Sequence, residues 1–171
     1  MKNRLFVIAL VAVAAVLVSS AVIANLSAGT KAPNFSLTAL DGKKFELQSN
    51  FKQPGKVVLL DIWATWCGPC RGEIPFLVKL STKYADKDVV FVGVAIDQQK
   101  STVADFARKQ KINYTIVHDP NAATVGGKYG VRGIPATYII DKKGVIRFAH
   151  SGFGGESDAA AMDKEIASLL K

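Results

Sequence analysis

Cysteine is scarce in this chain, where Cys67 and Cys70 are the only two among 171 residues. Two cysteines cannot form the framework of a small disulfide-stabilised scaffold. A chain of this length can bury a hydrophobic core without such a disulfide framework. A reactive or metal-binding role is therefore favoured over a stapling one. A peroxidase is disfavoured, because its peroxidatic cysteine would need another local setting and the sequence has no further cysteine.

Acidic residues are also in the minority, with 14 against 22 basic residues and a formal charge of +8. The basic excess is scattered in short pairs such as Lys43-Lys44 and Lys142-Lys143. These pairs lack the interleaved aromatic residues that proteins binding single-stranded nucleic acid use. The densest basic cluster, at 108–111, is typical of a solvated helix end. We therefore expect no nucleic-acid partner.

The N-terminus has a different composition from the rest of the chain. Lys2 and Arg4 precede a nearly uninterrupted apolar run at 5–24. The run is long enough to cross a hydrocarbon core of about 30 Å, and its small residues also suit a cleaved signal peptide, so both remain open. We expect a signal peptide or membrane anchor at 1–28 and one domain at 29–171. Either form of export places the domain outside the cytoplasm, in the periplasm or at the outer face of the cell membrane.

The remainder alternates between strand and helix patterns. A β-hairpin is expected first, with strands at 34–37 and 44–47 around Asp41-Gly42. Further strands are expected at 57–63, 89–96, 114–117, 136–140 and 145–148, and helices at 67–85, 101–109, 121–129 (broken by Gly126-Gly127) and 157–170. The alternation implies parallel βαβ connections, while the turn at 141–144 pairs the last two strands antiparallel. The predicted class is α/β, with a central mixed sheet flanked by helices and a leading hairpin.

The two cysteines stand where the predicted central strand gives way to a helix, in the run Trp-Ala-Thr-Trp-Cys-Gly-Pro-Cys. Cys67 is expected at the helix N-terminus, where unpaired backbone N–H groups and the helix dipole favour a thiolate near neutral pH. Thiolate is the attacking form in disulfide exchange. Cys70, about one turn into the helix, is expected to be more buried and to resolve the mixed disulfide. Trp63 is expected in the core.

Two segments of the chain carry a family resemblance. Residues 61–70, followed by Pro75, and residues 129–135 (Tyr-Gly-Val-Arg-Gly-Ile-Pro) resemble the thioredoxin superfamily. The resemblance covers 32–171 and implies a thioredoxin-like fold. The chain is similar to the membrane-tethered, extracytoplasmic thiol-disulfide oxidoreductases of the TlpA/ResA type. The shared features are the export segment, the leading hairpin and an extra segment at 97–119.

This resemblance implies an enzyme, a protein disulfide reductase. Its substrates would be exported proteins with disulfides, such as apocytochrome c, and its electrons would come from a membrane thiol donor. The membrane itself is a partner if the N-terminal segment stays uncleaved. No cofactor is implied beyond the redox-active disulfide between Cys67 and Cys70.

Two carboxylates are candidates for handling protons. Asp61 lies within the apolar strand, where an unpaired carboxylate should have a raised pKa and should accept the proton of Cys70. Thioredoxin has an acid at the matching position, whereas the TlpA/ResA group more often has an amide. Glu73 matches an acidic residue that tunes the thiols in ResA-like proteins. A solvated first-turn glutamate, favoured by the helix dipole, explains Glu73 equally well.

The resemblance also implies a substrate-binding surface around the cysteines. A cis-proline is implied at Pro135, and the backbone of the preceding residue would offer hydrogen bonds to an extended substrate segment by strand addition. Trp66 is expected to border the active surface. The candidate substrate-binding residues are Trp66, Gly68, Pro69, Ile134 and Pro135.

A thioredoxin-like copper metallochaperone is the alternative function, with the two thiols and His118 as ligands. The known copper carriers of this fold have a longer cysteine spacing, and a Cys-x-x-Cys pair alone leaves zinc two ligands short. His118 and His150 are isolated in the sequence, and each is better explained as a polar surface residue. No metal ligand is therefore assigned.

Overall fold

The computed structural model describes residues 26–171, so the predicted signal peptide or anchor lies outside the described residues. Within 26–171, every helix is too short or too polar to span a bilayer. A five-stranded sheet in the order β5-β4-β3-β6-β7 forms the centre of the fold. Its strands are β3 (Val57–Trp63), β4 (Val89–Ala95), β5 (Thr115–His118), β6 (Ala136–Ile140) and β7 (Ile146–Ser151). Because β3 pairs parallel with β4 and antiparallel with β6, the predicted mixed sheet is confirmed.

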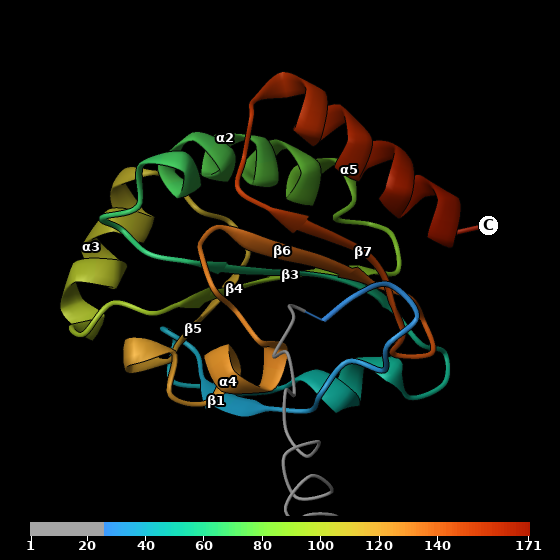
Figure 1. The fold of residues 1–171 in the computed structure, drawn as a ribbon, viewed down its shortest axis with the longest axis horizontal. Coiled ribbons are helices and arrows are strands. Elements are labelled where there is room, and N and C mark those ends of the chain that lie inside the picture. Colours follow the sequence, from blue (N-terminus) through green and yellow to red (C-terminus); the bar gives the residue numbers. More distant parts are fainter. Residues whose placement is uncertain (1–25) are drawn as a thin grey trace, which may run out of the picture.

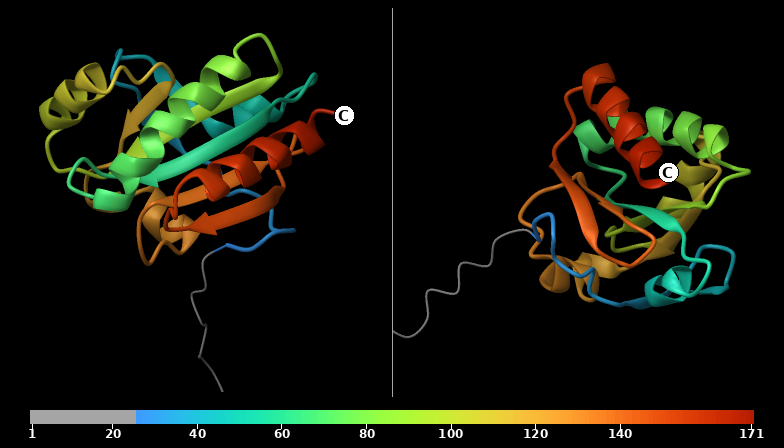
Figure 2. Two further views of the ribbon diagram at one scale, coloured as in Figure 1. Left: turned by 90° about the horizontal axis from the view of Figure 1, so that it is seen from above. Right: turned by 90° about the vertical axis from the view of Figure 1, so that its right-hand side faces the viewer.

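Helices cover both faces of the sheet (Figure 1). One face carries α2 (Gly68–Lys83), α5 (Glu156–Leu169) and, toward β5, α3 (Lys100–Lys109). The opposite face carries α4 (Val125–Tyr129), the 3₁₀ turn η1 (Leu47–Phe51) and the predicted hairpin of β1 (Ser36–Thr38) and β2 (Lys44–Glu46). Figure 2 shows α2 and α5 lying side by side over the same face of the sheet.

Strand β3 is buried along its whole length, as its continuous apolar run predicted. Its side chains alternate between two cores, because successive residues of a strand point to opposite faces. Leu59 packs in the core under α2 and α5, while Leu60 and Ile62 pack in the core under α4. Asp61 therefore faces α2, the helix that begins at the cysteines.

The expected break at Gly126-Gly127 is wrong. Both glycines lie inside α4, and the irregular backbone comes earlier, where Asn121 and Ala122 have φ of 56°. A Cβ on Gly126 would lie 2.6 Å from the Cβ of Ala122, so glycine serves close packing there rather than helix termination. The segment accordingly divides into the 3₁₀ turn η2 (Pro120–Ala122) and α4.

Candidate active site

The cysteines lie at the first turn of α2, which follows β3 after a short connection. They form a disulfide, and Cys67 is the residue that caps the helix. The backbone N–H of Cys70 donates to Cys67 Sγ at 3.2 Å. Such a donor, together with the positive end of the helix dipole, stabilises a thiolate at Cys67 once the disulfide opens. Cys70 is 1% exposed and Cys67 5%, so the expected order of burial holds by a narrow margin.

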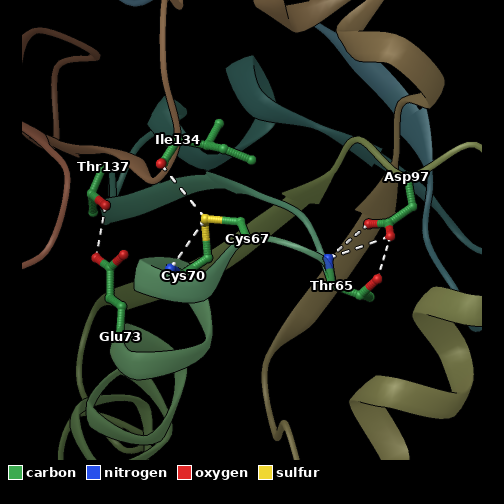
Figure 3. Close-up of a disulfide and its surroundings, with 7 residues drawn as sticks. All are labelled: Thr65, Cys67, Cys70, Glu73, Asp97, Ile134 and Thr137. Carbon is green, nitrogen blue, oxygen red and sulfur yellow. Dashed lines mark hydrogen bonds between the residues drawn. A yellow bond between two sulfur atoms is a disulfide. The ribbon is translucent and has the colours of Figure 1, made fainter.

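The loop that precedes β6 also lies against Cys67. The Ile134–Pro135 peptide bond is cis, as the resemblance implied. The carbonyl oxygen of Ile134 lies 3.6 Å from Cys67 Sγ (Figure 3). Pro135 itself is buried, whereas Ile134 is half-buried. A substrate at Cys67 would therefore meet the backbone of the loop rather than the proline ring.

The residues next to Cys67 in the sequence are exposed to solvent. Trp66 is the one large hydrophobic residue of the described chain that stands out, with 68% of its surface exposed. Gly68 and Pro69 are also exposed. These three residues are sequence neighbours of Cys67, and Trp63 lies fully in the core, as expected. The expected catalytic and docking residues are thus together at one end of the sheet.

Two carboxyl groups lie buried behind the disulfide. Asp61 on β3 is 1% exposed and pairs in register with Thr137 on β6. Glu73, one turn beyond Cys70 in α2, is fully buried and accepts a hydrogen bond from Thr137 Oγ1 at 2.8 Å (Figure 3). Of the two alternatives left open for Glu73, the solvated glutamate is therefore excluded, because α2 packs this residue of its second turn against the sheet.

Burial dominates the electrostatics of this carboxyl pair, by which we mean Asp61 and Glu73. Burial raises the pKa of Asp61 well above its usual range, and the charge of Glu73 raises it further, against the effect of the nearby Thr137 hydroxyl. Burial raises the pKa of Glu73 to about 7, opposed by the hydrogen bond from Thr137 and supported by the charge of Asp158 on α5. The predicted raised pKa of Asp61 is confirmed, but Asp61 is not a lone acid.

Two aromatic side chains extend this polar cluster toward β4. Trp63 Nε1 and the Tyr114 hydroxyl are both buried, and neither has a hydrogen-bond partner in the part of the chain described. The two rings meet over Gly93, where an added Cβ would lie 2.8 Å from Trp63 Nε1. Burial and the charges of Asp61 and Glu73 raise the pKa of Tyr114 well above its usual range. Tyr114 therefore faces the same buried charges as the carboxyl pair.

Sequence reasoning missed the residue that holds the segment before the cysteines. The carboxylate of Asp97, which follows β4, accepts from the backbone N–H of Thr65 at 3.1 Å and also from the Thr65 hydroxyl (Figure 3). Asp97 is 5% exposed. The carboxyl ends of parallel strands meet at one edge of a sheet. The acid just after the second buried strand could therefore have been predicted to lie near the cysteines.

His118 does not join the cysteines. It ends β5, two strands away from β3, and its Nε2 lies 2.7 Å from the carbonyl oxygen of Asp97. Over residues 26–171, no three or more His, Cys, Asp or Glu side chains gather as a metal-binding group. The ligand set expected for the copper alternative is therefore not assembled in this fold.

Comparison with known proteins points to one family. The redoxin family profile matches residues 27–166. The thioredoxin-like protein YneN of Bacillus subtilis (strain 168) is 41% identical over 130 residues, which are 75% of this chain and 74% of YneN. The thiol-disulfide oxidoreductase ResA of Bacillus thuringiensis (strain Al Hakam) is 35% identical over 122 residues, 71% of this chain and 68% of ResA.

A solved structure agrees with these sequence matches. A crystal structure from Chlorobium tepidum, described as a putative thiol:disulfide interchange protein DsbE, superimposes with a TM-score of 0.78 at 32% identity. The match covers 85% of this chain and 99% of the Chlorobium chain. The thioredoxin-like fold that the sequence predicted is thereby confirmed.

Proposed function

Because the chain belongs to the redoxin family and is a thiol-disulfide oxidoreductase of the TlpA/ResA-like thioredoxin type, we propose that it reduces disulfides in exported proteins outside the cytoplasm. The observation that best supports this reaction is the Cys67–Cys70 disulfide at the N-terminus of α2. The extracytoplasmic setting is supported by the apolar run at 5–24 behind two basic residues. That run serves as a signal peptide or as an anchor to the membrane.

The reaction proceeds by two exchanges of sulfur. In the reduced protein, the Cys67 thiolate attacks a substrate disulfide and displaces one substrate sulfur as thiolate. Cys70 then loses its proton to the carboxyl pair and attacks Cys67 Sγ. The bond between Cys67 and the substrate breaks, the second substrate sulfur leaves, and the Cys67–Cys70 disulfide closes. Two electrons have passed to the substrate, and a membrane thiol donor restores the reduced pair.

The docking surface suits an extended polypeptide. The backbone of Ile134 beside cis-Pro135 offers hydrogen bonds to a substrate strand, while exposed Trp66 supplies apolar contact area beside Gly68 and Pro69. Recognition through backbone is tolerant of sequence, as a reductase of several exported proteins requires. Apocytochrome c is the proposed substrate, because its haem-attachment segment is an extended Cys-x-x-Cys-His sequence that must be reduced.

The test uses two disulfide substrates with the full chain. A synthetic Cys-x-x-Cys-His peptide in its oxidised form and insulin are each reduced by wild type, Cys67→Ser and Cys70→Ser, with dithiothreitol as electron source. We expect turnover by wild type only and a higher kcat/KM for the peptide. Turnover of insulin without preference for the peptide would remove apocytochrome c as the substrate. Failure of wild type on both substrates would overturn the reductase function.

A further inference from the structure

A pocket of about 440 Å³ opens beside the cysteines, between the start of α2 and the side of α3. This α2–α3 pocket is lined by residues that include Thr65, Arg71, Asp105, Phe106 and Lys109. Thr65 is two residues before Cys67, which puts their Cα atoms within about 7.6 Å of each other. A substrate segment bound at Cys67 therefore passes close to this pocket.

The parts of the pocket nearest Cys67 are held in place by packing and hydrogen bonds. The backbone N–H and the hydroxyl of Thr65 both donate to the carboxylate of Asp97 (Figure 3). On the α2 side, the backbone N–H of Arg71 donates to the carbonyl oxygen of Cys67 at 3.1 Å. The Phe106 ring packs in the same apolar cluster as both cysteines. The pocket is therefore formed before a substrate binds, at a fixed position relative to the attacking sulfur.

The α2–α3 pocket carries a positive charge. Arg71 and Lys109 are both exposed, and neither side chain forms an ion pair within the described part of the chain. Among the described residues that line the pocket, Asp105 is the one acid, and Arg108 already pairs with its carboxylate at 2.7 Å. The Arg71 guanidinium lies over the Phe106 ring, 6.0 Å from its centroid. A cation over an aromatic ring keeps its hydrogen-bond donors, so the N–H groups of Arg71 are available to a ligand.

A carboxylate side chain is the group that fits these features best. A guanidinium binds a carboxylate through two parallel N–H···O bonds, and the ammonium of Lys109 adds a second positive charge. The Phe106 ring offers apolar surface to the methylene groups of a glutamate side chain. An extended strand advances by about 3.3 Å per residue, so a side chain two to four residues from the substrate cysteine reaches from Cys67 to the pocket.

We propose that the α2–α3 pocket is a subsite that selects substrates with a glutamate or aspartate two to four residues from the disulfide that Cys67 attacks. Arg71 is its main specificity-determining residue, and Lys109 strengthens the binding of the same carboxylate. This selectivity rests on the proposed reductase function, because it acts on the segment that is reduced. The subsite contacts no reacting atom, so it should lower KM rather than raise kcat.

Pairs of oxidised Cys-x-x-Cys-His peptides that differ at one position test this selectivity. One pair has Glu or Gln three residues before the first cysteine, and the other has Glu or Gln three residues after the second. The full chain reduces each peptide with dithiothreitol as electron source. In at least one pair, kcat/KM of wild type should be about 10-fold higher for the Glu peptide, the low end for a hydrogen bond to a charged group. The Glu/Gln ratio within one variant cancels any effect of a substitution on the thiols themselves.

Substitutions in the pocket should change this ratio. Arg71→Gln should bring it close to 1, and Lys109→Gln should lower it in part. Lys79→Gln is the matched control, because Lys79 is an exposed cation of the same helix and lies over the Phe76 ring, 5.4 Å from its centroid. The control should keep the wild-type ratio. A ratio near 1 for both pairs in wild type, one that survives Arg71→Gln, or one that falls equally in the control would overturn the proposal.

Binding without reaction separates the subsite from the reductase function. The oxidised full chain is titrated with the same peptides after serine has replaced both cysteines, and its backbone amide signals are followed by NMR. The Glu peptide should shift the signals of Thr65, Arg71 and Phe106 more than the Gln peptide does, and about 0.5 M salt should weaken this difference. Equal shifts with both peptides, or shifts only outside the pocket, would contradict the subsite. If the pocket binds the Glu peptide but wild type reduces no peptide, the reductase function fails and the subsite stands.

Discussion

Replacing Glu73 with glutamine should change how the stability of the protein depends on pH. Glu73 is fully buried, and its pKa is raised to about 7 from an ordinary value of 4.5. An acid whose pKa is raised by folding stabilises the native state while it is protonated. That contribution is complete below the unfolded pKa and is lost as the pH rises through the folded pKa.

The size of the effect follows from the shift. At about 1.4 kcal/mol per pKa unit, a rise from 4.5 to about 7 corresponds to about 3 kcal/mol. Native domains are stable by only about 5–15 kcal/mol, so this loss is a large share of the total. Glu73→Gln keeps a neutral group at every pH. Its unfolding free energy relative to wild type should therefore increase by about 3 kcal/mol between about pH 4 and about pH 8.

The assay is urea unfolding of the oxidised protein at several pH values, followed by circular dichroism. Glu156→Gln is the matched control, since it removes an exposed carboxyl from the first turn of α5. The difference between Glu73→Gln and wild type should grow with pH, whereas the control should follow wild type. Parallel pH profiles for Glu73→Gln and wild type would refute the conclusion that folding raises the pKa of Glu73.

Two further substitutions test the contacts around the site. Thr65→Val should lower the unfolding free energy by about 2 kcal/mol, because the buried carboxylate of Asp97 loses one of its donors, and Thr65→Ser should restore it in the same urea assay. A valine variant as stable as wild type would mean that this hydrogen bond contributes nothing. Gly93→Ala should cost about 1–3 kcal/mol, since its Cβ would lie 2.8 Å from Trp63 Nε1. Gly127→Ala, which meets nothing within 4 Å inside α4, should be neutral or stabilising by up to about 1 kcal/mol; equal losses at both glycines would rule out the packing explanation.

The sequence predicted those features that depend on neighbouring residues. The apolar run of β3 gave its bounds at 57–63, and the position of Cys67 at the helix start followed from the same junction. The break near α4 was misplaced, because glycine pairs signal interruption locally while the actual irregularity lies at Asn121 and Ala122. An alanine with positive φ carries no recognisable sequence signal.

The partners of the carboxyl pair could not be predicted, because they come from distant strands. Thr137 reaches Glu73 only through the register of β6 against β3, and Tyr114 reaches the pair only across β4. Glu73 was ambiguous for a related reason. A glutamate near the start of a helix suits solvent and interior equally, and only the packing of α2 on the sheet decides between them.

The central claim is that Cys67 attacks and Cys70 resolves, and trapping of the intermediate tests it most directly. Reduced Cys70→Ser and Cys67→Ser are each incubated with the oxidised Cys-x-x-Cys-His peptide, and the adducts are located by mass spectrometry after digestion. Cys70→Ser should accumulate a mixed disulfide in which the peptide is bound to Cys67, while Cys67→Ser should accumulate little. An adduct that forms mainly on Cys70, or none on either variant, would contradict the account.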